Sequence, residues 1–204
     1  MGHIPAFRGY IFDLDGTVYR GDRLLPGARE TIQGLRVAGR RVVFLSNKPI
    51  DTRESYARKL RCLGVPTRTA DVINSSFVLA RYLSARTPRA RLFVIGERPL
   101  LAELRRAGFR IVANGDQADW VVIAFDRTFD YAKLTGALHA VRRGARLIAT
   151  NPDRTCPVEG GEIPDCAAMI GAVEGATATR VEVIVGKPSR ITLDVCLAQM
   201  GLRA

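Results

Sequence analysis

Short apolar runs alternate with longer amphipathic segments along most of the chain. Runs of strand length cover residues 9–12, 41–45, 92–95, 120–125, 146–150 and 182–185. Apolar positions at helical spacing predict helices over residues 26–39, 51–64, 76–85 and 131–143. Three more helices are predicted, of which one ends at residue 108, one follows residue 164 and the last begins near residue 189. Repeated strand–helix–strand units predict a parallel sheet with helices on both faces. Residues 151–164, rich in Gly and Pro, are interpreted as a looser stretch.

Length and composition agree with this α/β pattern and exclude several classes of protein. The 204 residues suffice for one large domain, or for one domain with a second inserted in it. A content of 47% hydrophobic and 25% charged residues excludes collagen-like, disordered and disulfide-scaffold chains. The longest apolar run, residues 120–125, is far shorter than the ~18 residues of a membrane helix. Residues 1–6 have no cationic segment before an apolar one, so we expect no secretory signal, no membrane partner and a cytoplasmic location.

The cysteines and the basic charge both favour ordinary structural explanations. The four cysteines, at positions 62, 156, 166 and 196, form no Cys-x-x-Cys pair, so zinc and redox motifs are absent and we expect small buried thiols. The net charge is +11, but the arginines are scattered, with no run longer than two and no interleaved aromatics. We expect a dispersed, solvated basic surface and no nucleic-acid partner. Salt-dependent retention on DNA would favour the alternative of a nucleic-acid-binding protein.

Two carboxylates directly follow the first predicted strand. Asp13 and Asp15 stand at i and i+2, which puts both side chains on one side of an extended chain, and Gly16 allows the backbone to turn away. Ligands of open α/β sheets bind at the carboxyl ends of the strands. The motif is therefore a candidate catalytic site. The alternative is an ordinary strand-to-turn junction closed by Asp-Gly.

Polar groups also follow two later strands. Ser46 and Asn47 directly follow the strand 41–45 and offer a hydroxyl and an amide that can donate to a phosphoryl oxygen. Lys187, in a Gly-Lys-Pro sequence, follows the apolar strand 182–185 and would bring a cation to the same sheet edge. The alternatives are a helix-entry turn for the first pair and a solvated surface lysine for the second.

These strand ends, in this order, resemble the haloacid dehalogenase superfamily of aspartate-nucleophile phosphatases. Residues 13–17 match its first motif, residues 46–47 its second and Lys187 its third. Residues 149–153 and 186–188 are similar to the NagD-like subgroup, class IIA. Residues 22–36, 44–47 and 167–174 are most similar to the AraL-type sugar phosphatases within it. The resemblance implies a Rossmann-like parallel-sheet core, formed by residues 1–79 and 182–204, with an inserted α/β cap domain of the C2 type at residues 80–181.

The resemblance also implies a magnesium-dependent phosphatase that forms an aspartyl-phosphate. Asp13 would be nucleophile and metal ligand, and Asp15 would be the general acid and base while its backbone carbonyl also binds the Mg²⁺ ion. Gly16, Ser46, Asn47 and Lys187 would bind the phosphate. Dehalogenases of the superfamily lack the second carboxylate and its transport ATPases carry Thr there, so Asp15 favours a phosphatase.

The loop at residues 126–129 follows a strand of the expected cap. By resemblance, Asp126, Arg127 and Phe129 face the substrate and help to select the leaving group, with Arg127 contacting a hydroxyl or a second anion. The alternative is a solvated turn. The resemblance also makes a homodimer through the cap an expectation, because such dimers are common in this subgroup.

One family feature is missing from the sequence. The acidic fourth motif, whose aspartate completes the metal site, has no match after Lys187, and Asp194 lies inside a predicted helix. We therefore expect a fragment or a truncated protein, whose own activity would be weak. The leading hypothesis is a phosphatase for small phosphate monoesters such as sugar phosphates. The alternative is a truncated, non-catalytic relative that binds a phosphate ester, and the sequence does not name the ester.

Overall fold

The computed structural model describes residues 7–203, which group into two compact units. The first unit comprises residues 7–46, 53–74 and 193–203, and the second comprises residues 47–52 and 75–192. The expected division into a catalytic core and an inserted cap stays a prediction. The expectation of no secretory signal concerns residues 1–6, which lie outside the described residues.

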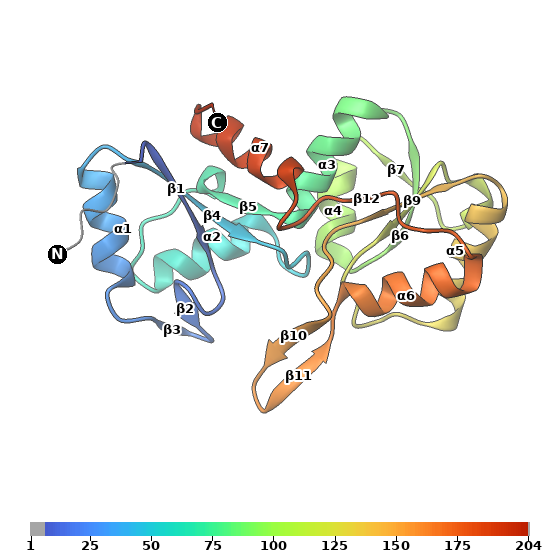
Figure 1. Ribbon diagram of the computed structural model, residues 1–204, viewed down its shortest axis with the longest axis horizontal. Coiled ribbons are helices and arrows are strands. Elements are labelled where there is room, and N and C mark those ends of the chain that lie inside the picture. Colours follow the sequence, from blue (N-terminus) through green and yellow to red (C-terminus); the bar gives the residue numbers. More distant parts are fainter. Residues whose placement is uncertain (1–6, 204) are drawn as a thin grey trace. The chain divides into compact units, whose positions relative to one another are not determined.

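The first unit is built on a short parallel sheet (Figure 1). Its strand order is β1-β4-β5, with β1 at Gly9–Asp13, β4 at Arg41–Ser46 and β5 at Val72–Asn74. The other elements of this unit are a hairpin of β2 (Tyr19–Arg20) and β3 (Arg23–Leu24), the helices α1 (Ala28–Val37) and α2 (Arg53–Cys62), the short helix η1 (Thr69–Asp71) and α7 (Arg190–Met200) from residue 193 onward. Because β1 and β4 are parallel, with Asp13 paired to Leu45, their carboxyl ends meet at one edge.

The second unit contains a five-stranded sheet in which every pairing is parallel. Its order is β12-β9-β8-β6-β7, with these strands at Val183–Ile184, Arg146–Ala149, Trp120–Ile123, Arg91–Ile95 and Arg110–Ile111. The helices are α3 (Ser75–Arg86), α4 (Arg98–Arg106), η2 (Gly115–Gln117), α5 (Tyr131–Arg142) and α6 (Cys166–Thr177). Two parallel sheets connected through helices confirm the predicted α/β class.

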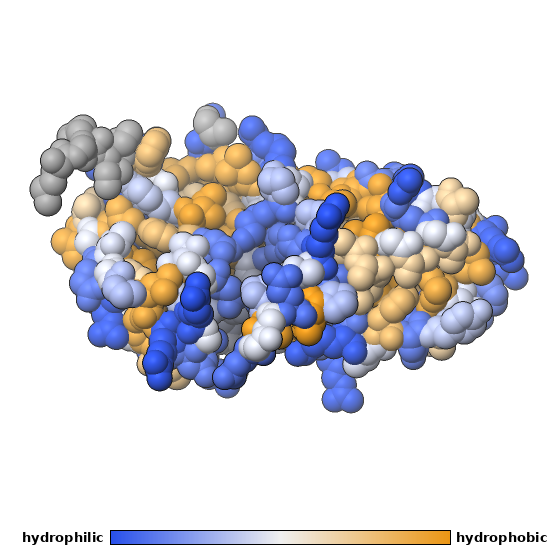
Figure 2. Space-filling model, turned by 60° about the horizontal axis from the view of Figure 1, so that its bottom comes forward, coloured by the Kyte–Doolittle hydropathy of each residue, from blue (hydrophilic) through white to orange (hydrophobic). Residues whose placement is uncertain are grey.

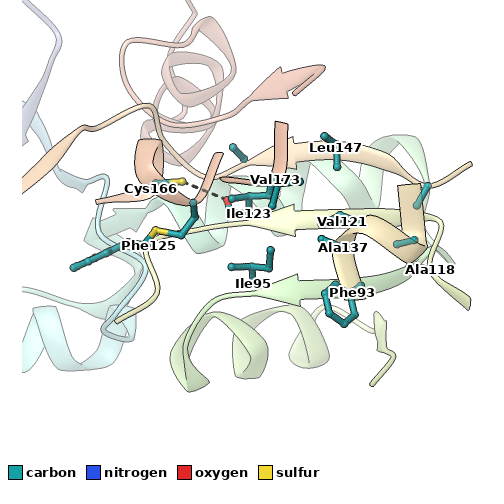
Figure 3. Packing of buried hydrophobic residues seen from close by; sticks show 14 of the residues in the cluster. Phe93, Ile95, Ala118, Val121, Ile123, Phe125, Ala137, Leu147, Cys166 and Val173 are labelled. Carbon is teal, nitrogen blue, oxygen red and sulfur yellow. Dashed lines mark hydrogen bonds between the residues drawn. The ribbon is translucent and has the colours of Figure 1, made fainter. Parts of the chain in front are cut away.

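Apolar side chains of the central strands form the core of the second unit (Figure 3). Side chains of β6, β8 and β9 pack against α5 and α6, and members of this cluster such as Ile123 and Val173 are fully buried. The sequences of these strands are continuous apolar runs because helices cover both faces of a parallel sheet. Cys166, the first residue of α6, packs here and donates from its Sγ to the carbonyl oxygen of Ile123 over 3.5 Å.

The interpretation of residues 151–164 as a loose stretch was wrong in part. Within it, β10 (Thr155–Val158) and β11 (Gly161–Pro164) form an antiparallel hairpin that extends away from the sheet of its unit in Figure 1. Glu159 and Gly160 form its turn, and Gly160 has a positive φ angle. The hairpin buries little, since of β10 only Cys156 is buried, so it lacks the apolar alternation by which a strand is recognised.

Cys156, Cys166 and Cys196 are buried free thiols as predicted, but Cys62 is exposed at the end of α2, so the prediction was wrong for that residue. Hydrophilic residues are spread over the face shown in Figure 2 and are mixed with hydrophobic ones. Among residues 7–203, no helix combines the length and the apolar character that crossing a membrane requires.

Candidate active site

The two carboxylates of the first motif leave the end of β1. Asp13 is the last residue of the strand and is half-buried, whereas Asp15 is exposed. Leu14 lies between them and is fully buried in the core of the first unit, so the alternation of an extended chain directs both aspartates away from that core. The sequence therefore produces a pair of carboxylates on one side of the backbone because the residue between them is the apolar anchor.

A tight turn directly after Asp15 fixes this arrangement. Gly16 has a φ of 81°, a left-handed conformation that favours glycine. Its N–H donates to the carbonyl oxygen of Tyr19 at 2.7 Å, and the N–H of Val18 donates to that of Leu14 at 2.9 Å. Tyr19 and Val18 are both buried, so the turn is anchored in the core rather than being a loose surface loop.

Ser46 is the last residue of the neighbouring strand β4. The register pairs Asp13 with Leu45, so Ser46 lies one residue beyond the partner of Asp13 at the same sheet edge. Ser46 is also buried, at 4% exposure. The first unit thus brings four of the predicted residues, Asp13, Asp15, Gly16 and Ser46, to one edge of its sheet.

The second unit brings Asn47 and Lys187 together, although they are 140 residues apart. The backbone N–H of Lys187 donates to Oδ1 of Asn47 at 2.8 Å, and Nδ2 of Asn47 donates to the carbonyl oxygen of Lys187 at 3.4 Å. Nδ2 also donates to Oδ2 of Asp153 at 2.9 Å. The predicted donation from this side-chain amide to a phosphoryl oxygen would have to compete with these bonds.

The glycine before Lys187 is required by this close packing. A Cβ atom on Gly186 would lie 2.8 Å from Oδ1 of Asn47 and would overlap the carbonyl oxygen of Thr150. Gly186 itself is buried. The Gly-Lys-Pro sequence therefore has a steric reason, which is the approach of the Lys187 loop to Asn47 and to the end of β9.

Behind Asn47 lies a second layer of buried polar groups that the sequence analysis did not assign. Nδ2 of Asn151 donates to Oδ2 of Asp153 and to Oδ1 of Asp165, both at 3.0 Å. Oδ1 of Asp165 accepts the N–H of Cys166 at 2.6 Å and so caps α6. Burial raises the pKa of the Asp165 carboxyl above its ordinary value. The sequence analysis identified residues 149–153 only by their similarity to the NagD-like subgroup, and no sequence spacing indicated Asp165.

Cys166 adjoins this layer but has the wrong chemistry for a nucleophile. Burial raises the pKa of its thiol to about 12, so the thiolate is not formed near neutral pH. Its Sγ accepts from Oγ1 of Thr150 at 3.8 Å. Cys166 is therefore a structural residue of the second unit.

The loop predicted to face the substrate is held by two ion pairs. Asp126 is buried at 1% exposure, and its Oδ2 lies 2.6 Å from Nζ of Lys133, while its Oδ1 accepts from the N–H of Thr128 at 2.9 Å. Arg127 donates from Nε and Nη2 to the two carboxylate oxygens of Glu97, at 2.7 and 2.8 Å.

These contacts anchor the loop within the second unit. The hydrogen bond and charge of Arg127 lower the pKa of the Glu97 carboxyl, and the same contact raises the pKa of Arg127. Phe129 is half-buried and packs against the core cluster of this unit. The role of the loop in substrate selection stays a prediction.

A divalent cation would find oxygen donors of the right kind beside Asp13. Mg²⁺ prefers carboxylate, carbonyl and water oxygens and usually keeps several waters. The Asp13 carboxylate and the backbone carbonyl of Asp15 are such donors, so these residues fit the ion. Across residues 7–203 there is no group of three or more His, Cys, Asp or Glu side chains placed to hold a metal.

Comparisons with known proteins show which family the chain belongs to. The haloacid dehalogenase-like hydrolase family matches residues 10–110. The chain is 42% identical over 196 residues to the sugar-phosphatase AraL of Bacillus subtilis, a match that covers 96% of this chain and 72% of that relative. Among solved structures, the p-nitrophenyl phosphatase from Archaeoglobus fulgidus is similar with a TM-score of 0.90 at 35% identity, covering 96% of this chain and 74% of that one.

A further solved structure, described as a nagD protein, is similar with a TM-score of 0.93 at 33% identity and covers 98% of this chain and 79% of that one. The identity to relatives of this kind is well above the level at which only a fold is shared. The chain belongs to the haloacid dehalogenase-like hydrolases, within their NagD-like group of phosphatases.

Proposed function

We propose that this protein is a magnesium-dependent phosphatase that hydrolyses small phosphate monoesters, sugar phosphates in particular, through an aspartyl-phosphate. The observation that carries the proposal is the pair Asp13 and Asp15 at the carboxyl end of β1, with Ser46 at the end of the adjacent parallel strand. The similarity of the chain to a sugar phosphatase and to a p-nitrophenyl phosphatase supports this substrate class.

In the proposed first step, a carboxylate oxygen of Asp13 attacks the phosphorus atom. The new O–P bond forms as the ester P–O bond breaks, and Asp15 donates a proton to the departing alkoxide. A bound divalent cation would offset the repulsion between the carboxylate and the phosphate dianion. Asp15 is exposed and lies directly before the turn at Gly16, so it is in a suitable place to reach a leaving group.

In the proposed second step, the Asp15 carboxylate takes a proton from water as that water attacks the phosphorus of the aspartyl-phosphate. The Asp13 carboxylate is regenerated and inorganic phosphate leaves. The Ser46 hydroxyl and the Lys187 ammonium are proposed to neutralise charge on the transferred phosphoryl group. Asn47 is proposed to serve mainly through its backbone N–H, because its side chain holds the Lys187 loop.

The test is a phosphatase assay with p-nitrophenyl phosphate and a panel of sugar phosphates, with Mg²⁺ or with EDTA. The wild type should need Mg²⁺, and Asp13→Asn should lose nearly all turnover, given that enzymes supply accelerations of ~10⁶-fold or more. More than about a hundredth of wild-type kcat in Asp13→Asn would refute the assignment. Binding of a sugar phosphate without turnover by the wild type would favour the non-catalytic alternative.

A homodimer is proposed as well and is checked by light scattering.

A further inference from the structure

A cavity in the first unit is lined by five arginines. It measures about 740 Å³, a size typical of small-molecule sites. The arginines come from α1, from the residue before β4, from the first residue of β4, from α2 and from the segment before η1, and are Arg36, Arg40, Arg41, Arg61 and Arg68. The proposed phosphatase chemistry uses none of them.

The lining of the cavity contains one carboxylate beside these five arginines. Asp71 lies 3.0 Å from Nη2 of Arg68 and 4.0 Å from Nη2 of Arg36, and it is the acidic residue of the cavity lining. Guanidinium groups stay protonated at every pH of interest, so the remaining positive charge cannot be relieved by titration. A bound anion would relieve it.

Two of the guanidinium groups are held in place by backbone oxygens. Arg36 donates to the carbonyl oxygen of Pro66, and Arg61 donates from Nη1 to that of Thr67 at 2.8 Å. A carbonyl oxygen orients a guanidinium without neutralising its charge. These arginines are therefore ordered cations at the wall of the cavity.

Arg40, which directly precedes β4, and Arg41, the first residue of β4, have no such partner. Within residues 7–203, the guanidinium groups of Arg40 and Arg41 make no hydrogen bond or ion pair, and both residues line the cavity. A planar guanidinium with free N–H groups matches the oxygens of a phosphate in a two-pronged geometry. Several arginines around one concave space suit a ligand with several phosphate groups better than one with a single charge.

The cavity is distinct from the edge that carries Asp13 and Ser46. Arg41 begins β4 and Ser46 ends it, so the two ends are roughly 16 Å apart at the ~3.3 Å rise of each residue in a strand. We infer that this arginine-lined cavity is a binding site for a small polyphosphate anion, separate from the proposed catalytic edge.

The test is calorimetric titration of the 204-residue chain with sodium triphosphate, at physiological salt and without Mg²⁺. The wild type should bind, and the double variant Arg40→Gln/Arg41→Gln should bind at least about tenfold more weakly, because charge-assisted bonds to phosphate are among the stronger polar contacts. The matched control is Arg81→Gln/Arg89→Gln, which removes two exposed arginines of the second unit and should change the dissociation constant less than twofold.

Three results would overturn the inference. The first is that the wild type does not bind triphosphate. The second is an equal loss of triphosphate affinity in both double variants, which would indicate general charge attraction. The third is loss of binding in Lys187→Ala, which would put the triphosphate at the proposed catalytic centre instead. Thermal unfolding checks that each variant folds, and triphosphate should raise the Tm of the wild type but not that of Arg40→Gln/Arg41→Gln. None of these outcomes depends on whether the protein hydrolyses phosphate esters.

Discussion

Nδ2 of Asn47 donates to Oδ2 of Asp153 at 2.9 Å, across 106 residues of sequence. Asn47 follows β4 directly, and through its Oδ1 it also holds the backbone N–H of Lys187. Asp153 thus orients the asparagine that fixes the lysine loop. Asp153 touches no reacting group in the proposed reaction, but it can influence catalysis through Asn47 and the Lys187 loop.

Replacing Asp153 should therefore affect turnover. In Asp153→Ala, Asn47 and Asn151 each lose an acceptor, and the loop of Lys187 loses part of its support. We expect kcat to fall about ten- to a hundredfold, the equivalent of one or two unsatisfied buried polar groups. KM should change less. Asp153→Asn keeps one acceptor oxygen and should recover part of the loss.

The matched control for this prediction is Glu162→Ala, which removes an exposed carboxylate from β11 and should leave kcat unchanged. Steady-state kinetics with p-nitrophenyl phosphate measure all three variants. Wild-type kcat in a correctly folded Asp153→Ala would show that Asn47 needs no support from this carboxylate.

Asp15→Asn should distinguish substrates by their leaving groups. A sugar alkoxide needs a proton to depart, whereas p-nitrophenolate leaves without one. We expect kcat/KM for sugar phosphates to fall at least tenfold more than kcat/KM for p-nitrophenyl phosphate. Equal losses for the two substrates would mean that Asp15 serves the metal or the turn at Gly16 and not proton transfer.

Gly186→Ala should destabilise the second unit. The added Cβ would lie 2.8 Å from Oδ1 of Asn47 and would overlap the Thr150 carbonyl oxygen, so backbone must shift. Overpacking of this kind costs roughly 1–3 kcal/mol, which corresponds to a Tm lower by about 3–10 °C. The control Gly171→Ala, in α6 with open space around it, should keep the wild-type Tm or raise it slightly. Equal Tm values for wild type and Gly186→Ala would contradict the steric argument.

The ion pair of Glu97 with Arg127 should give a pH-dependent contribution to stability. Arg127 lowers the pKa of the Glu97 carboxyl in the folded protein, so the stabilisation is complete above the unfolded pKa of about 4.3 and is lost as pH falls through the folded pKa. Because Arg127 is half-exposed, we expect Glu97→Gln to lower the free energy of unfolding by only about 1 kcal/mol at pH 7.

Denaturant titrations at pH 7 and at successively lower pH values measure this difference, which should shrink toward zero at the acid end. Glu159→Gln, which alters an exposed carboxylate in the β10–β11 hairpin, serves as the control and should show no such trend. A Glu97→Gln effect that is constant with pH would mean that shape, and not charge, holds the loop.

The sequence by itself determined the α/β class and the residues at the ends of β1 and β4. Each of those signals is local, because a buried apolar strand followed by carboxylates or a hydroxyl is visible in a few consecutive positions, as at Asp13 and Ser46. The family followed from the same short motifs, and the comparisons confirm it.

Tertiary structure alone decided which groups support the site. Asn47 is 106 residues from Asp153 and 140 from Lys187 in the chain. These hydrogen bonds, and that of Asn151 to Asp165, depend on how β9, α6 and the Lys187 loop pack in the second unit. Arg127 likewise acquires Glu97 as a partner 30 residues away. No local pattern encodes such pairings, since a side-chain hydrogen bond requires a direction and a distance that only the folded chain supplies.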